Sequence, residues 1–398
     1  MTPAARLSAA IEVLDEVLAG TAADRALAAW GRSRRFAGAK DRAAIADLVY
    51  DALRCRRTLA RLGGGETGRG LIVGLSGGQE ALFHGAAHGP APLTGAERAA
   101  RLAPAGGTLP ERLDFPDWME APLTRALGAE LEPVMEALRH RAPLDLRVNL
   151  ARATPEAACA ALAEDGVRAT PLPAEPAALR VAEGARALRR AAAYLDGRVE
   201  IQDLSSQRVA RFAGALPGQT VLDYCAGGGG KTLALGMHMQ GRGRLIAHDI
   251  APARMKDLMP RATRAGLSVE TIAPEGPGGG RGPALGCDLV LADAPCSGTG
   301  AWRRNPDAKW RLTQADLTAL TRLQDRVLDA AARHVRPGGV LVFATCSLLV
   351  EENDDRVAAF LQRNREFAGG DTLRLTPLDG GDGFFAARLA RRPAPPAG

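Results

Sequence analysis

The stretch Asp223-Tyr224-Cys225-Ala226-Gly227-Gly228-Gly229-Gly230-Lys231-Thr232 decides the fold class of this chain. It follows an apolar segment typical of a strand, 221–224, and leads into a segment with helical spacing, 232–239. A glycine-rich turn between a strand and a helix lets a ligand approach the backbone closely. The ending Gly230-Lys231-Thr232 suggests a phosphate-binding P-loop, but that motif needs a glycine where Cys225 stands. The spacing therefore excludes the ATPase interpretation.

Strand-like and helix-like segments alternate from about residue 219 onward. The expected strands are 221–224, 244–248, 269–272, 288–292 and 340–345, and the expected helices are 232–239, 252–265, 313–335 and 351–363. Strands that are apolar on both faces and alternate with helices predict an α/β fold with a doubly wound parallel sheet. Ligands of such sheets bind at the carboxyl ends of the strands.

An acid stands where the second expected strand ends. Asp249 lies about 20 residues beyond the glycine turn, where a carboxylate can accept both hydroxyl groups of a ribose. The turn and the acid together indicate a nucleoside-bearing cofactor, either a dinucleotide or S-adenosylmethionine. A merely flexible glycine turn is the alternative.

Two cysteines follow two neighbouring expected strands. Cys296 ends the run Asp293-Ala294-Pro295-Cys296, and Cys346 lies in Thr345-Cys346-Ser347. Their thiols and the Asp293 carboxylate would converge beside the cofactor, although a buried structural role is the alternative for any single cysteine. Thiolate addition at carbon 6 of a pyrimidine activates carbon 5 for methylation, and a carboxylic acid near ring nitrogen 3 neutralises the developing charge. The residues alone leave either thiol as the nucleophile.

Composition limits the class of protein. The 398 residues suggest two or three domains, and the net charge of +6 permits a polyanionic partner such as RNA. The six cysteines have no C-x-x-C or zinc spacing, so we expect reduced thiols and no metal. Since neither a membrane-spanning run nor a signal peptide is recognisable, we expect a cytoplasmic protein without membrane contact.

The pattern divides the chain into four parts. Residues 1–105 read as an all-helical domain, 106–195 as a small α+β subdomain, 196–390 as the sheet domain and 391–398 as a disordered tail. Basic residues between 32 and 61 form either a phosphate-contacting face or a solvated helical surface. The segment 302–311 (WRRNPDAKWR) interleaves aromatic and cationic residues, which suits single-stranded RNA, and a packed loop is the alternative.

The motifs together resemble the RsmB-type (Sun/Fmu) family of RNA cytosine-5 methyltransferases. The resemblance covers most of the chain and includes the glycine turn and both cysteine motifs, together with Gln202-Asp203, Ser205-Ser206, Arg304-Asn305-Pro306-Asp307, Glu351-Glu352-Asn353 and Asp382-Gly383-Phe384-Phe385. Residues 35–61 resemble the NusB-type helical domain of the bacterial ribosomal RNA enzymes, and residues 111–195 resemble their small RNA-binding subdomain. The resemblance implies a Rossmann-like class I methyltransferase core.

The resemblance also implies roles for single residues. Cys346 would be the nucleophile, Cys296 would assist release, and Asp293 would stabilise the activated cytosine near the methionine part of S-adenosylmethionine. Asp249 would hold the ribose. DNA cytosine-5 methyltransferases use a Pro-Cys thiol instead, so Cys296 competes, but the Thr-Cys motif favours Cys346. The residues implied to line the cofactor are Cys225, Ala226, Gly227, Gly228, Gly229, Gly230 and Lys231.

The expected function is RNA cytosine-5 methylation, on small-subunit ribosomal RNA, by a monomer. The alternatives are the same chemistry on transfer RNA, or a non-catalytic RNA-binding factor for ribosome assembly. The sequence departs from the family in two places. Gly227-Gly228 replaces the usual Ala-Pro, which loosens the turn. No adenine-contacting acid is evident after the third expected strand, where the stretch 271–280 offers only Glu275.

Overall fold

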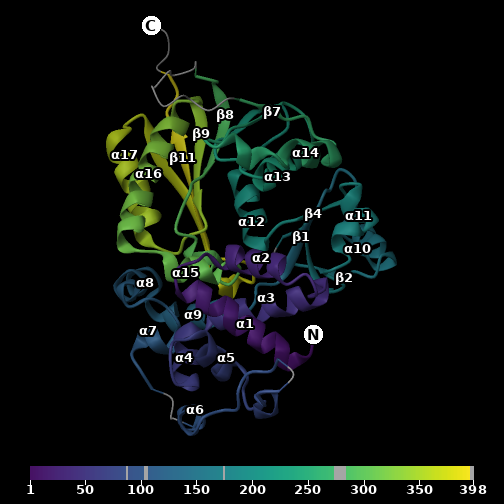
Figure 1. The fold of residues 1–398 in the computed structure, drawn as a ribbon. Helices are drawn as coiled ribbons and strands as arrows, with labels where there is room; N and C mark the ends of the chain where they lie inside the picture. The colour runs from purple at the N-terminus through teal and green to yellow at the C-terminus, as the bar shows by residue number, and fades with distance from the viewer. Residues whose placement is uncertain (87, 103–105, 174, 273–283, 395–398) are drawn as a thin grey trace. The chain divides into compact units, whose positions relative to one another are not determined.

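The computed structural model describes residues 1–86, 88–102, 106–173, 175–272 and 284–394 (Figure 1). The chain forms two compact units. The first unit holds Met1–Arg141 together with Ala301–Leu312, and the second holds Ala142–Gly300 together with Thr313–Gly398. The boundaries predicted from the sequence at 105 and 195 stay predictions, and Glu275 lies outside the described residues.

The first unit is helical. Mainly aliphatic residues at helical spacing build its core, in which Leu14, Val49 and Ile72 are fully buried. Within the described ranges, no helix of the chain is long and apolar enough to cross a bilayer. The helices of this unit are α1 (Pro3–Leu18), α2 (Ala23–Ser33), α3 (Ala39–Arg54), α4 (Arg56–Gly63), α5 (Gly68–Leu75), α6 (Gly95–Arg101), α7 (Leu109–Arg112), α8 (Glu120–Leu127), α9 (Leu131–Leu138) and α15 (Pro306–Arg311).

The segment 301–312 packs into this helical unit. Trp302 is 1% exposed, Arg54 donates a 2.9 Å hydrogen bond to the carbonyl of Arg303, and Lys309 donates one of 2.9 Å to the carbonyl of Arg54. The Arg54 and Lys309 side chains thus supply hydrogen bonds to backbone carbonyl groups of this unit. The expectation of an RNA-contacting surface is therefore wrong for Trp302, Arg303 and Lys309, all of which are buried.

The second unit begins with a small antiparallel sheet in the order β2-β3-β1-β4. Thr154 caps the helix α10 (Pro155–Glu164), which has Pro155 in its first turn. Leu146, Leu162 and Leu179 form part of the core between this sheet and its helices. The remaining elements are β1 (Leu144–Val148), β2 (Arg168–Pro171), β3 (Ala178–Glu183), α11 (Ala192–Leu195) and β4 (Val199–Ile201).

The large sheet of the second unit has seven strands in the order β10-β11-β9-β8-β5-β6-β7. β5 to β9 are parallel, which confirms the predicted Rossmann-like α/β fold, and the last two strands join antiparallel to them. The strands are β5 (Thr220–Asp223), β6 (Arg244–Ala247), β7 (Glu270–Thr271), β8 (Cys287–Asp293), β9 (Val335–Thr345), β10 (Phe367–Leu375) and β11 (Phe384–Arg391).

Helices cover both faces of this sheet (Figure 1). Val209, Leu233 and Leu258 belong to the core on one face, and Leu328 and Phe360 belong to the core on the other. The first face carries α12 (Leu204–Ala213), α13 (Gly230–His238) and α14 (Leu258–Ala265), and the second carries α16 (Gln314–Ala332) and α17 (Asp354–Arg363).

Two expected helices are shorter than their sequence pattern. The segment 252–265 divides into a 3₁₀ turn, Pro252–Met255, and α14. The segment 351–363 begins with the 3₁₀ turn η7 (Val350–Glu352), and α17 starts only after Asn353, whose φ of −114° and ψ of −95° are not helical. Asn353 accepts a 2.6 Å hydrogen bond from Thr345 and donates one of 2.9 Å to the carbonyl of Ser347. These contacts hold its backbone away from the helix.

Candidate active site

The glycine turn connects β5 to α13, as the sequence predicts. Gly227 and Gly229 have φ values of +50° and +84°, which favour glycine. A Cβ atom on Gly229 would lie 2.2 Å from Cδ1 of Leu258. The turn therefore depends on glycine for both its conformation and its packing against α14.

Side chains from three elements fix this turn in place of a proline. Arg147 of β1 donates a 2.9 Å hydrogen bond to the carbonyl of Gly230, and Arg261 of α14 donates to the carbonyl of Gly228. Asp249, just beyond β6, accepts one of 3.0 Å from the backbone N–H of Gly227. The Gly-Gly departure noted in the sequence is thus accompanied by direct bonds to the backbone of the turn.

Asp249 lies at the carboxyl end of β6 beside the turn and is 1% exposed. Its second oxygen accepts a 2.9 Å hydrogen bond from the backbone of Ala251, and Arg254 lies 3.4 Å from the carboxylate. The Arg254 side chain is 56% exposed. An exposed arginine can move aside for a ligand hydroxyl group, since such ion pairs contribute little stability.

Lys231 and Asp293 form an ion pair between the first turn of α13 and the end of β8. Their Nζ and Oδ2 atoms are 2.6 Å apart, and Nζ lies 4.8 Å from the ring centre of Phe384. Burial by itself would lower the pKa of Lys231, but the charge and hydrogen bond of Asp293 outweigh it and raise that pKa. Lys231 is therefore a charged hydrogen-bond donor at this edge of the sheet.

Asp223 is a third acid near this pair, at the end of β5. Thr232 donates a 2.6 Å hydrogen bond to its Oδ2 atom. Burial raises the pKa of Asp223 to about 7, against the hydrogen bond from Thr232, and the nearby Asp293 charge adds to the increase. The carboxyl group therefore changes between its protonated and ionised forms near neutral pH.

The two cysteines of the strand ends meet. The Sγ atoms of Cys296 and Cys346 are 3.4 Å apart, and both residues are partly exposed. β8 and β9 pair in parallel with Asp293 opposite Ala344, so their carboxyl ends bring the two loops together. The hydrogen bond with Cys346, followed by burial, raises the pKa of the Cys296 thiol well above its usual value. Burial likewise raises the pKa of Cys225, which lies in the glycine turn.

The arrangement fits an adenosyl cofactor with a methionine tail. The glycine turn, Asp249 and the Lys231–Asp293 pair lie at the carboxyl ends of neighbouring strands β5, β6 and β8. Close backbone approach, a ribose acceptor and paired charges are the features that such a molecule requires. Across the described part of the chain, no cluster of three or more His, Cys, Asp or Glu side chains could hold a metal ion.

Some residues of this site carried no assigned role in the sequence. Arg147, Arg254 and Arg261 are three arginines among many, and nothing in their spacing distinguishes them. Glu352 belongs to the Glu351-Glu352-Asn353 motif, but only the structure shows that it is fully buried and bonded to both cysteine loops.

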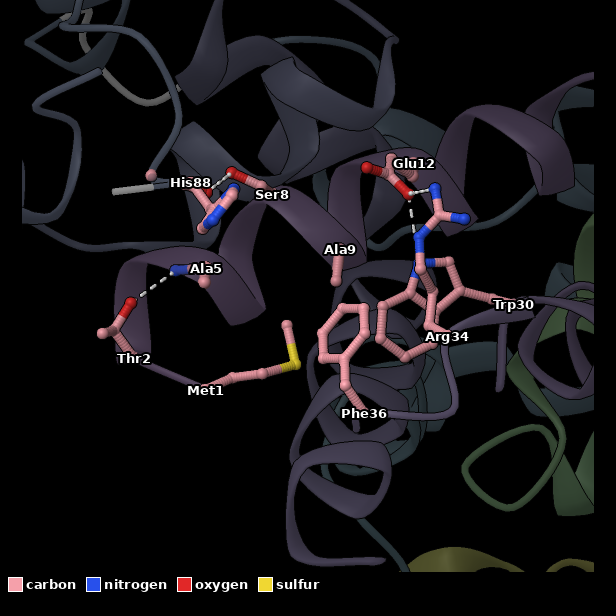
Figure 2. Close-up of a pocket in the computed structure, with 11 residues that line it drawn as sticks. Met1, Thr2, Ala5, Ser8, Ala9, Glu12, Trp30, Arg34, Phe36 and His88 are labelled. Atoms are coloured by element: carbon pink, nitrogen blue, oxygen red, sulfur yellow. Dashed lines mark hydrogen bonds and ion pairs between the residues drawn. The ribbon is translucent and has the colours of Figure 1, made fainter. Parts of the chain in front are cut away.

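A separate hollow lies on the first unit (Figure 2). It has a volume of about 800 Å³, and Trp30, Phe36 and Met1 give it an apolar wall. Figure 2 shows Glu12 bonded to both Trp30 and Arg34 at its edge. None of the catalytic or cofactor-binding residues predicted from the sequence lines this hollow, although Arg34 of the basic stretch does.

Comparison with known proteins identifies the family. Residues 214–390 match the model of the 16S rRNA methyltransferase RsmB/F family, and residues 115–187 match the ferredoxin-like domain of RsmF/B-like methyltransferases. The ribosomal RNA small subunit methyltransferase B of Salmonella typhi is 35% identical over 294 residues, which span 71% of this chain and 67% of that protein. The protein of the same name from Erwinia tasmaniensis is 34% identical over 70% of this chain and 66% of its own.

Solved structures show the same fold. The crystal structure of PH0851 has a TM-score of 0.76 at 24% identity and covers 98% of this chain and 99% of its own. NSun6 from Pyrococcus horikoshii, solved with SFG, has a TM-score of 0.61 at 19% identity and covers 70% of this chain and 98% of its own. By its family match and its curated relatives, this chain belongs to the RsmB/F family of S-adenosylmethionine-dependent methyltransferases.

Proposed function

We propose that this protein methylates carbon 5 of a cytosine in small-subunit ribosomal RNA, with Cys346 as the nucleophile. The observation that carries the proposal is the 3.4 Å approach of the Cys296 and Cys346 sulfur atoms, together with the electrostatic interaction of Cys346 with Lys231 of the Lys231–Asp293 pair. Two thiols and a carboxylate beside a nucleoside site suit covalent activation of a pyrimidine. Small-subunit ribosomal RNA is inferred from the name of the relatives.

We assign the cofactor to the glycine turn, 225–231, and to Asp249. Bound S-adenosylmethionine supplies an electrophilic methyl group at the carboxyl end of the sheet. Asp249 would accept the ribose hydroxyl groups after Arg254 moves aside, and the backbone of Gly227 to Gly229 would border the adenosyl part. The arginine bonds to this turn preorganise it, which lowers the entropy cost of binding.

Cys346 would start the reaction by adding to the base. Its thiolate forms a bond to carbon 6 of the cytosine, and the electron pair of the carbon 5–carbon 6 double bond moves onto carbon 5 and ring nitrogen 3. The Lys231–Asp293 pair would deliver a proton to nitrogen 3 and so neutralise the charge that develops there. Carbon 5 then has the electron density that attack on a methyl group requires.

Release reverses the addition after methylation. A base removes the proton from carbon 5, the carbon 5–carbon 6 double bond forms again, and the electrons of the carbon 6–sulfur bond return to Cys346. The proton on nitrogen 3 returns to the Lys231–Asp293 pair. The thiol of Cys296, 3.4 Å away, can donate its proton to the leaving thiolate. We propose that residues 1–105 and 106–195 contribute RNA-binding surface to the same reaction.

Nucleoside analysis of RNA methylated by the purified protein tests this proposal. Incubation with S-adenosylmethionine and unmethylated 16S ribosomal RNA should produce 5-methylcytidine, detected by mass spectrometry, and bisulfite sequencing should locate it. Transfer RNA serves as the comparison substrate. Methylation of transfer RNA alone would contradict the ribosomal assignment. Calorimetry that detects no binding of S-adenosylmethionine would contradict enzymatic function and support a non-catalytic assembly factor.

A further inference from the structure

The two cysteine loops end in serines that share one acid. Ser297 follows Cys296, Ser347 follows Cys346, and both bind the carboxylate of Glu352. Glu352 lies in the turn η7 before α17 and is 0% exposed. A buried carboxylate is costly unless hydrogen bonds compensate for its lost solvation. We therefore examine what this buried carboxylate does between the two cysteine loops.

Each oxygen of Glu352 accepts hydrogen bonds from residues that define the loops. Oε1 accepts a hydrogen bond of 2.8 Å from the backbone N–H of Ser297 and one of 2.9 Å from Nε2 of Gln324 in α16. Oε2 accepts a hydrogen bond of 2.5 Å from the hydroxyl of Ser347 and another from the hydroxyl of Ser297. Gln324 also donates a hydrogen bond of 2.9 Å to the carbonyl of Pro295. One carboxylate thus holds both cysteine loops at a fixed separation.

The charge of Glu352 acts on the thiol of Cys296. Its four donors are neutral groups, so they solvate the carboxylate without cancelling its charge. After the hydrogen bond with Cys346, burial and the Cys346 charge, the Glu352 charge is a further cause that raises the pKa of Cys296. The Lys231 ammonium interacts electrostatically with Cys346 and is paired with Asp293 of β8.

We propose that Glu352 is a positioning residue for the two cysteine loops: its carboxylate fixes their spacing and places a buried negative charge beside the loop of Cys296, which suits this thiol to the role of hydrogen-bond donor. Cys296 then remains the hydrogen-bond donor toward the sulfur of Cys346, 3.4 Å away. This inference rests on the proposed function for its catalytic meaning. Its physical content, the effect of Glu352 on the reactivity of Cys296, is measurable without RNA or cofactor.

Alkylation of the folded protein by iodoacetamide, followed across pH by peptide mass spectrometry at low conversion, tests the proposal. Only thiolates react, so the rate at each cysteine follows its ionisation. In the unmodified protein Cys346 should react before Cys296. Glu352→Gln removes the charge and retains the shape, and it should raise the rate at Cys296 at pH 8 about tenfold, the effect of about one pKa unit. Glu352→Asp retains the charge and should keep the rate at Cys296 low.

The matched control is Asp354→Asn, which removes a carboxylate two residues further along, where it pairs with Arg374 at the surface. It should leave both rates unchanged. An unchanged rate at Cys296 in Glu352→Gln, or an equal rise in Glu352→Asp, would overturn the proposal. Should Glu352→Gln fail to fold, earlier reaction of Cys296 than of Cys346 in the unmodified protein overturns it as well. Failure of the RNA methylation test leaves these alkylation rates unaffected, so the two proposals fail separately.

Discussion

At the scale of single residues, Asp249 has two tasks. It accepts a hydrogen bond from the backbone N–H of Gly227 and, by our proposal, hydrogen bonds from the ribose hydroxyl groups of the cofactor. Asp249→Asn keeps a side-chain oxygen but loses the charge, and hydrogen bonds to charged groups contribute about 1.5–3 kcal/mol. We expect the dissociation constant of S-adenosylmethionine, measured by calorimetry, to rise about tenfold or more. Asp257→Asn, at an exposed position nearby, is the control, and an unchanged constant in Asp249→Asn would remove Asp249 from the site.

Asp223 predicts a pH dependence of stability. Its pKa of about 7 in the folded protein lies above the usual carboxyl value, so the folded state binds a proton that the unfolded chain has released. This contribution to the free energy of unfolding is fully present below about pH 4 and is lost as the pH rises through about 7. The side chain of Asp223→Asn does not titrate, so this variant does not lose stability in this way as the pH rises. Relative to the unmodified protein, it should gain up to about 1.4 kcal/mol per pH unit between pH 5 and 7 in urea unfolding.

A matched exposed acid serves as the control for this measurement. Asp371→Asn, in β10, should show no such trend with pH. A stability difference between Asp223→Asn and the unmodified protein that is equal at pH 5 and pH 7 would contradict the assignment.

How much of the site the sequence could predict also differs residue by residue. Cys296, Cys346 and Asp293 follow strands whose apolar pattern is plain, so their meeting follows from the topology of a parallel sheet. Glu352 follows a strand as well, yet its burial depends on contacts with Ser297 and Ser347 that no spacing reveals. Hydrogen bonds between loops that are distant in the sequence produce no periodic pattern of residues from which they could be predicted.

At the scale of elements, the glycine turn is tested by two substitutions at similar backbone angles. Gly229 and Gly218 have φ values of +84° and +88°, but only at Gly229 would a Cβ atom collide with a neighbour, Leu258. Gly218→Ala should cost about 1 kcal/mol of unfolding free energy from backbone strain alone. Gly229→Ala should cost more in the same denaturation measurement and should weaken S-adenosylmethionine binding. Equal costs for the two variants would contradict the packing described for α14.

The same turn shows why some element boundaries could not be predicted. β5, β6, β7, β8 and α13 lie close to their predicted ranges because their apolar residues fill the two faces of the sheet, whereas β9 begins at Val335, five residues before its predicted start. The helix expected at 252–265 divides, and Arg254 from its first part and Arg261 from its second both reach the turn region. Contacts between elements determine this break, whereas helical periodicity alone predicts continuity.

At the scale of the whole molecule, the segment 301–312 leaves the second unit and stabilises the first. The helix α2 has no side-chain cap of its own, and Asp307 accepts a 3.1 Å hydrogen bond from its first backbone N–H, at Ala23. Asp307→Ala should lower the stability of the helical unit by about 1–3 kcal/mol, the cost of a buried unpaired donor.

Tryptophan fluorescence measures this effect selectively. All four tryptophans, Trp30, Trp118, Trp302 and Trp310, belong to the first unit. The fluorescence transition in urea should move to lower concentration in Asp307→Ala, while the dissociation constant of S-adenosylmethionine stays unchanged. A loss of cofactor affinity without a shift in fluorescence would contradict the assignment of this segment to the helical unit.

The most direct test of the account as a whole uses RNA that contains 5-fluorocytidine at the methylated position. Fluorine replaces the proton that must leave carbon 5, so the bond between the enzyme and carbon 6 persists and survives denaturation. Mass spectrometry of the digested complex should find the RNA attached to Cys346. With ordinary RNA, Cys296→Ala should accumulate a covalent adduct of Cys346 with the methylated cytosine, whereas Cys346→Ala should form none. Attachment at Cys296, or a stable complex in Cys346→Ala, would contradict the account.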